Sequence, residues 1–216
     1  MNTTEQRIFT SHRCAAGFSE GLPDEYAQDI LHLLQSADAF ACRAYDRQQS
    51  WISWQDRYCN RLEKYGCTRR SVIDSTPHFI RSLHELQALT LNVIGMHDGG
   101  RLVDLSRECV QALAIGTVAG AFFSGRVAGG YSQNWQVTPC GQNDHGEVEL
   151  LVLGVHMACN VESRSHGLWT ADTREVVLRL KGGVYCFEPQ RFEPWREEIL
   201  SALTVARKQA FVRTLL

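Results

Sequence analysis

Apolar residues recur every three or four positions through the first half of the chain, which is the spacing of amphipathic helices. The pattern predicts one helix over about 23–47 and a second over 50–66, each with a suitable start and stop residue. Two such helices in succession favour a hairpin. Further helices are expected over about 77–96 and from about Leu102 onward, with a short strand over 70–74 before them.

The stretch from Ala112 to Gly130 is rich in small residues and differs from the helices before it. No residue is charged from Cys109 to Phe123, a run of 15 residues. A membrane-spanning helix needs roughly 20 apolar residues, so we expect a buried helix whose small residues allow close packing. A membrane-inserting segment is the alternative, and it would make Phe122 and Phe123 candidate membrane contacts.

The pattern changes to strands after Gly130. Apolar and polar residues alternate over 131–140, and the polar segment Gly-Gln-Asn-Asp-His-Gly at 141–146 then predicts a hairpin connection. Residues 147–159 are almost continuously apolar, which indicates a central strand covered on both faces. Strand patterns return over 168–170 and 176–181, and we expect the two glycines at 182–183 to kink or end that strand.

These elements predict an α+β fold: a helical N-terminal half, an antiparallel sheet of about four strands and a C-terminal helix after Pro189 or Pro194. We expect residues 1–216 to form a single domain with a loose arm at 1–20. The composition is 44% hydrophobic and 21% charged, which is ordinary for a globular protein. It excludes a disordered chain, a collagen-like chain and a membrane protein with many spans.

The net charge of -2 gives no general attraction for nucleic acid, and we expect no nucleic-acid partner. Residues 43–70 nevertheless concentrate positive charge, because seven basic residues there exceed three nearby acidic ones. Trp51 and Trp54 lie among them and are candidate membrane contacts. A basic, tryptophan-bearing helical hairpin could bind an anionic lipid surface. The alternative is a solvated basic face whose tryptophans belong to the core.

The chain has eight cysteines but no Cys-x-x-Cys pair, and its first residues lack the apolar core of a signal peptide. We therefore expect reduced thiols and a cytoplasmic location in the producing cell, with export by a non-classical route and membrane association left open. Cys140 lies between Pro139 and Gly141 and looks least like a core residue. Cys140 and Cys159, at the end of the apolar strand, are candidate acylation or reactive-thiol sites.

Two kinds of chemical site can be drawn from the cysteines and histidines. A zinc site from Cys140, His145, His156 and Cys159 is disfavoured, since side chains three apart on a strand point to opposite faces. We expect no metal. A thiol-dependent hydrolase or acyltransferase would use Cys140 or Cys159 with His156 or His166 as base. The local sequences match no catalytic motif, so an enzyme is the alternative rather than the leading interpretation.

Three groups of positions resemble the Erwinia virulence factor family of small bacterial proteins. The groups are the two N-terminal helices, the long apolar strand, and the last strand with the closing helix: Leu34, Ala37, Ala41, Trp51, Tyr58, Leu62 and Gly66; Val148 to Met157; Trp169, Phe187, Phe192 and Arg196. The resemblance implies an α+β effector rather than a housekeeping enzyme. It also implies a fatty acyl group on a cysteine, although no local motif identifies which one.

The leading hypothesis is therefore a non-enzymatic bacterial virulence or effector-type protein that contacts a membrane surface or a host protein. We expect no cofactor other than a candidate covalent fatty acyl group. A thiol-dependent enzyme and a cytosolic partner-binding protein remain as alternatives. The sequence does not indicate the oligomeric state.

Overall fold

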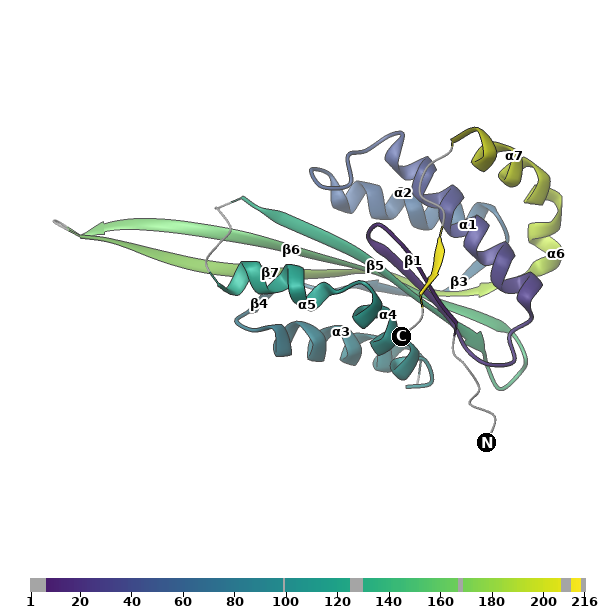
Figure 1. Ribbon diagram of the computed structural model, residues 1–216, viewed down its shortest axis with the longest axis horizontal. Coiled ribbons are helices and arrows are strands. Elements are labelled where there is room, and N and C mark those ends of the chain that lie inside the picture. The colour runs from purple at the N-terminus through teal and green to yellow at the C-terminus, as the bar shows by residue number, and fades with distance from the viewer. Residues whose placement is uncertain (1–6, 99, 125–129, 167–168, 207–210, 215–216) are drawn as a thin grey trace.

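The computed structural model describes residues 7–98, 100–124, 130–166, 169–206 and 211–214, without the side chains of residues 98, 161–166, 169–174 and 205–206. A sheet of eight strands forms its middle layer, in the order β3-β7-β6-β5-β2-β1-β8, with β4 also paired to β7 (Figure 1). The strands are β1 (Arg7–Ser11), β2 (Cys14–Phe18), β3 (Cys67–Asp74), β4 (His78–Ile80), β5 (Ser132–Gln142), β6 (Val148–His166), β7 (Trp169–Phe187) and β8 (Val212–Thr214).

Helices cover both faces of the sheet (Figure 1). One layer contains α1 (Asp24–Cys42), α2 (Trp51–Lys64), α6 (Pro189–Phe192), the 3-10 helix η1 (Glu193–Trp195) and α7 (Arg196–Ala206). The other layer contains α3 (Leu83–Asp98), α4 (Val103–Ala112) and α5 (Ile115–Phe123). The α+β class predicted from the sequence is confirmed.

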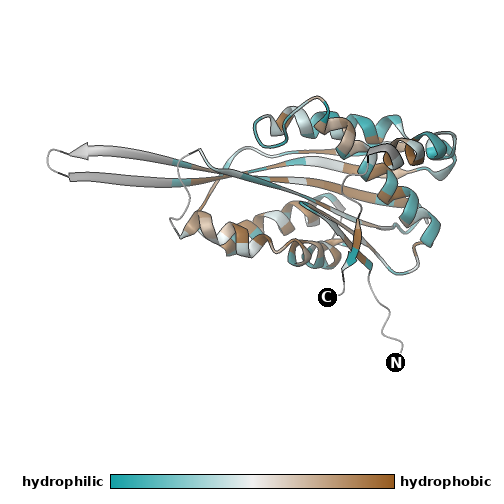
Figure 2. Ribbon diagram, turned by 45° about the horizontal axis from the view of Figure 1, so that its top comes forward, coloured by the Kyte–Doolittle hydropathy of each residue, from teal (hydrophilic) through white to brown (hydrophobic). Residues whose placement is uncertain are grey.

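The apolar strand predicted over 147–159 is central and is covered on both faces, as expected. In β6, Leu150 and Val152 belong to the core beneath α1 and α2, whereas Leu151 and Leu153 belong to the core beneath α3, α4 and α5. Figure 2 shows hydrophobic segments of the strands between the two helical layers. Successive residues of one strand therefore serve two separate cores.

Strands β6 and β7 have 19 residues each and pair along their whole length, from Val148 opposite Phe187 to His166 opposite Trp169. Figure 1 shows them continuing beyond the other elements as a two-stranded ribbon. The expectation that the glycines at 182–183 would kink or end the strand is wrong, because β7 passes through both. A Cβ on Gly182 would overlap the carbonyl oxygen of Val152, so the glycine permits close strand pairing.

The sheet is larger than the four strands expected and is not purely antiparallel, since β2 pairs with β5 in parallel. Residues 7–18 form β1 and β2, so the expected loose arm is wrong for that segment, and residues 1–6 lie outside the described residues. Strand β2 has five residues, most of them with small side chains, and all five are buried. A Cβ on Gly17 would lie 2.7 Å from Cys109 Sγ of α4, so the small residue lets the helix pack on the strand.

Two helix boundaries differ from the prediction. Helix α1 ends at Cys42 because Asp46 Oδ1 accepts the backbone N–H groups of Gln48 and Gln49 and fixes a turn. The segment after Pro77 begins as β4, and α3 starts only after Ser82, whose hydroxyl accepts the Glu85 N–H at 3.2 Å.

The small-residue stretch begins at the end of α4, and Ala114, which has a left-handed backbone conformation, separates that helix from the nine residues of α5. Part of the stretch lies outside the described residues. None of the described helices has the length and apolar character needed to span a bilayer.

Candidate functional site

Four basic side chains lie on the α1–α2 hairpin without an ion pair to any carboxylate that the structure describes. They are Arg43, at the end of α1, and Arg57, Arg61 and Lys64 of α2, and together with Phe40 we call them the basic face. Among the residues that the structure describes, no carboxylate forms an ion pair with any of these four cations. Arg43 Nε instead donates to the carbonyl oxygen of Ala39 at 3.3 Å.

Aromatic rings hold the cations of the basic face. The guanidinium carbons of Arg57 and Arg61 lie 4.1 and 4.3 Å from the ring centroid of Phe40. Arg61 also lies 4.0 Å from the centroid of Tyr65, and Lys64 Nζ lies 5.5 Å from that of Trp195. Each such contact contributes about 0.5–1 kcal/mol at a partly exposed site. The rings orient these cations but do not neutralise their charge.

The other basic residues of the predicted cluster are already paired. Arg69 Nη2 is 2.7 Å from Glu63 Oε1, and Arg70 Nη2 is 3.0 Å from Glu147 Oε1. Arg47 turns inward, with its side chain only 13% exposed and Nη1 at 3.4 Å from Asp38 Oδ1. The sequence therefore predicted the local excess of charge, but not which cations remain available.

Three of the four candidate membrane contacts are buried. Trp51 is 4% exposed and Trp54 is fully buried, both between α2 and the sheet. Phe122 is buried against Tyr131, with ring centroids 5.2 Å apart, and Phe123 is half-buried. The two tryptophans and the two phenylalanines lie in the two opposite helical layers, so the structure does not bring them together. The alternative that the tryptophans belong to the core agrees with these positions.

The two candidate thiols are fully buried, and the expectation that Cys140 is the cysteine least like a core residue is wrong. Cys140 points into the core beneath α1 and α2, where burial raises the pKa of its thiol well above the usual value. Cys159 lies in the core on the other face of the sheet. The sequence misled here because the strand continues past Pro139 and Gly141, to Gln142. Acylation of either thiol stays a prediction.

The residues of the zinc and enzyme alternatives are dispersed. His145 is exposed in the β5–β6 turn, and His156 stacks on Trp51 with ring centroids 5.0 Å apart. His156 faces α2 and Cys159 lies in the core on the other side of the sheet, so the two point to opposite faces, as their spacing predicts. The His166 side chain lies outside the described residues. Within the described part of the chain, no group of three or more His, Cys, Asp or Glu residues is arranged to hold a metal ion.

Sequence reasoning missed a polar cluster around Arg47. Its Nη1 lies 3.4 Å from Cys14 Sγ, and its guanidinium carbon lies 4.2 Å from the Trp54 ring centroid. Trp54 Nε1 donates to Cys42 Sγ at 3.2 Å. The cluster adjoins a cavity of about 850 Å³ between α1, the β1–β2 strands and α7. No local motif joins these residues, because they come from segments that only the fold brings together.

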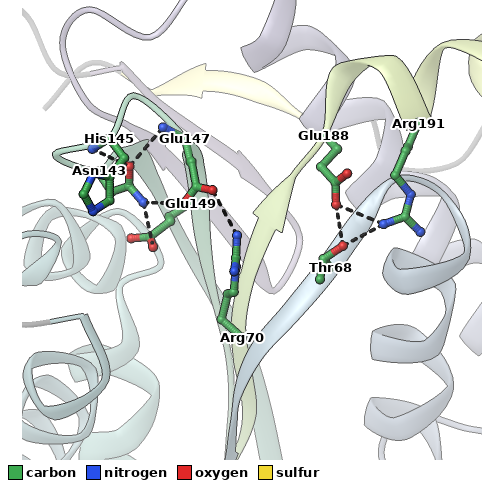
Figure 3. A network of polar contacts seen from close by, with 8 residues as sticks. All are labelled: Thr68, Arg70, Asn143, His145, Glu147, Glu149, Glu188 and Arg191. Carbon is green, nitrogen blue, oxygen red and sulfur yellow. Dashed lines mark hydrogen bonds and ion pairs between the residues drawn. The ribbon is translucent and has the colours of Figure 1, made fainter.

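A second polar network lies at the end of the sheet away from the ribbon (Figure 3). Asn143 Oδ1 accepts the backbone N–H groups of His145 and Glu147 and fixes the β5–β6 turn. On β3, Thr68 donates to Glu188 and accepts from Arg191 Nη1 at 2.6 Å. Arg191 also pairs with Glu188, so the charges in this network largely neutralise one another. This arrangement is typical of a protected sheet edge rather than of a ligand site.

Comparisons with known proteins give weak similarities. No protein-family model and no curated protein matches the chain. A solved structure named "DELTA-ENDOTOXIN" has 12% sequence identity and a TM-score of 0.45, over 80% of each chain. Another, named "Structure of the Evf virulence factor", has 13% identity and a TM-score of 0.42, over 87% of this chain and 77% of that one. The second similarity is a weak structural resemblance between this chain and a protein of the family that the sequence pattern indicated.

Proposed function

We propose that this chain is a non-enzymatic, virulence- or effector-type protein that acts at an anionic membrane surface through its basic face. The effector character rests on the sequence resemblance described above. The membrane contact rests on one observation: Arg43, Arg57, Arg61 and Lys64 share one surface, and no carboxylate of the described residues forms an ion pair with them. Like charges gathered without compensation are unfavourable in the isolated protein, and an anionic partner removes that cost.

The environment of Arg61 supports an anionic partner. Burial lowers the pKa of the Arg61 guanidinium, and the nearby Tyr65 and Glu198 offset only part of that shift. The neighbouring Glu198 accepts a hydrogen bond from Tyr65 at 2.9 Å, and its charge acts on Arg61 without forming a direct ion pair. An anion at this position would stabilise the charged form of Arg61.

The expected binding is reversible. Each Lys or Arg close to an anionic membrane contributes about 1 kcal/mol, so four cations contribute about 4 kcal/mol. Stable anchoring normally needs a second signal. The exposed side chains of Tyr45 and Ile52 lie on the same hairpin and supply apolar surface. A fatty acyl group on Cys140 or Cys159 would require the surrounding core to open, and intact mass before and after hydroxylamine treatment tests for it.

The test is co-sedimentation with vesicles of phosphatidylcholine, with and without phosphatidylglycerol, at low and high salt. The double variant Arg57→Gln/Arg61→Gln removes two cations. We expect it to bind about 30-fold more weakly than the wild type, corresponding to about 2 kcal/mol. Arg107→Gln is the matched control, because Arg107 is exposed on α4 in the other helical layer and pairs with Asp104.

Equal binding of the wild type to neutral and anionic vesicles, or no binding to either, would contradict the proposal. A host protein captured through the basic face, without vesicle binding, would instead favour the protein-partner alternative.

A further inference from the structure

The outer side of α2 carries a groove within the basic face. Residues Ser53, Arg57, Asn60, Arg61 and Lys64 follow one another at helical spacing and line one side, while Phe40 of α1 lines the other. The groove has a volume of about 560 Å³, which is sufficient for a polar headgroup. Its walls therefore combine three cations with a hydroxyl and an amide.

The two arginines in the groove are held in place before any ligand arrives. Both guanidinium groups stack on Phe40, and Arg61 also stacks on Tyr65. The Nε atoms of Arg57 and Arg61 are buried and have no hydrogen-bond partner among the residues that the structure describes. A cation that lies over a ring face uses none of its N–H donors in that contact. Among the described residues, the Tyr65 hydroxyl engages Arg61, and the remaining terminal donors of the two guanidinium groups are available for an anion.

The groove contains one acid, and that acid is occupied. Asp56 Oδ1 lies 3.0 Å from Lys181 Nζ of β7. Lys181 also lies 3.5 Å from Asp74, so this ion pair ties α2 to the sheet. Asp56 therefore offsets less of the positive charge at Arg57 and Arg61 than its position in the groove would suggest.

The donor set distinguishes between kinds of anion. A guanidinium forms paired hydrogen bonds with two oxygens of a phosphate, whereas a lysine acts as a point charge. A phosphomonoester carries about -1.5 to -2 charges and three acceptor oxygens, enough to engage two guanidinium groups together. A phosphodiester carries a single charge and only two free oxygens.

We propose that the groove between Phe40 and α2 binds a phosphomonoester group carried by a membrane lipid, with Arg57 and Arg61 as its main ligands. This inference rests on the proposed function, because it specifies which anionic headgroup the basic face recognises. Ser53 and Asn60 add a hydroxyl and an amide beside the two guanidinium groups, and Lys64 adds a third positive charge.

The test compares vesicles that contain phosphatidic acid with vesicles that contain phosphatidylglycerol, adjusted to the same surface potential. We expect the wild type to bind phosphatidic acid about tenfold more tightly, which corresponds to one additional charge-assisted contact. The double variant Arg57→Lys/Arg61→Lys keeps both charges but loses the paired donors. It is expected to bind phosphatidylglycerol like the wild type and to lose the preference for phosphatidic acid. Arg107→Lys, on the opposite helical layer, is the matched control.

Equal wild-type binding to the two vesicle types would overturn the phosphomonoester inference and leave the membrane function intact. Retention of the preference in the double lysine variant would also overturn it. Absence of binding to both vesicle types would contradict the proposed function itself.

Soluble glycerol phosphate separates the two sources of the phosphate group. We expect it to displace the protein from phosphatidic acid vesicles more strongly than chloride at equal ionic strength. Equal displacement by the two salts would overturn the inference. Binding of glycerol phosphate in solution, seen as a raised Tm, together with no preference between the vesicles would assign the groove to a soluble ligand and overturn the lipid assignment.

Discussion

Trp51 stacks on His156, with ring centroids 5.0 Å apart and planes inclined by 19°. This contact attaches the first turn of α2 to β6. Asn134 lies opposite His156 on β5, and Arg179 lies opposite it on β7. Burial, with a smaller contribution from the charge of Arg179, lowers the pKa of His156 from 6.5 to about 4. The folded protein therefore favours the neutral imidazole at this position.

This pKa predicts a loss of stability in acid. Above pH 6.5 the histidine is neutral in both the folded and the unfolded chain, so it contributes no pH dependence. As the pH falls from 6.5 toward about 4, the unfolded chain binds a proton that the folded chain resists, and the free energy of unfolding falls. The full effect is about 3 kcal/mol.

Urea unfolding of the wild type and of His156→Phe across this pH range measures the effect. The phenylalanine keeps an aromatic ring against Trp51 but cannot be protonated, so its stability is expected to decline less in acid. His145→Gln is the control, because His145 is exposed in the β5–β6 turn. Parallel decline of the wild type and His156→Phe would show that another group causes the acid sensitivity.

The second prediction concerns the close approach of β6 and β7. In Gly182→Ala the new methyl group would overlap the carbonyl oxygen of Val152, so the strands must separate. We expect a loss of about 3 kcal/mol in the free energy of unfolding, at the upper end for overpacking. Gly120→Ala in α5 is the matched control, since in the described part of the chain no atom beyond its own helix turn lies within 4 Å of the added Cβ. The control is expected to be stabilised by about 0.5–1 kcal/mol. Equal stability of the two variants would contradict the register of β6 against β7.

The third prediction concerns thiol reactivity. Cys42 is exposed, whereas Cys140 and Cys159 are fully buried. Under native conditions iodoacetamide should therefore label Cys42 first, and it should reach Cys140 and Cys159 only after denaturation. Peptide mapping by mass spectrometry measures the order. Rapid native labelling of Cys140 would revive the thiol-dependent enzyme and acylation hypotheses.

Local sequence predicted the elements whose signals are local. The apolar spacing of α2, with Ser50 before it and Gly66 after it, gave a nearly correct helix, and the φ of +98° at Gly66 explains the glycine there. The continuous apolar run of β6 correctly indicated a strand between two layers. In both cases the residues that determine the element lie within it.

The sequence could not predict features that depend on distant segments. Strand β2 is built from small residues without a strong strand preference, and it is ordered by its parallel pairing with β5. Likewise, the seven basic residues of 43–70 looked alike, but Arg70 is neutralised by Glu147, which lies far away in the chain. The basic face emerges only when those long-range partners are known.

The most direct measurement asks which surface of the protein contacts the vesicle. A Cys42→Ser background removes the exposed thiol, and an environment-sensitive fluorophore is attached through Asn60→Cys, in the groove of the basic face, or through Arg107→Cys, on α4. With phosphatidylglycerol vesicles, the emission of the probe at position 60 should shift to the blue, and that of the probe at position 107 should stay unchanged. A shift at position 107 without one at position 60 would contradict membrane binding through the basic face.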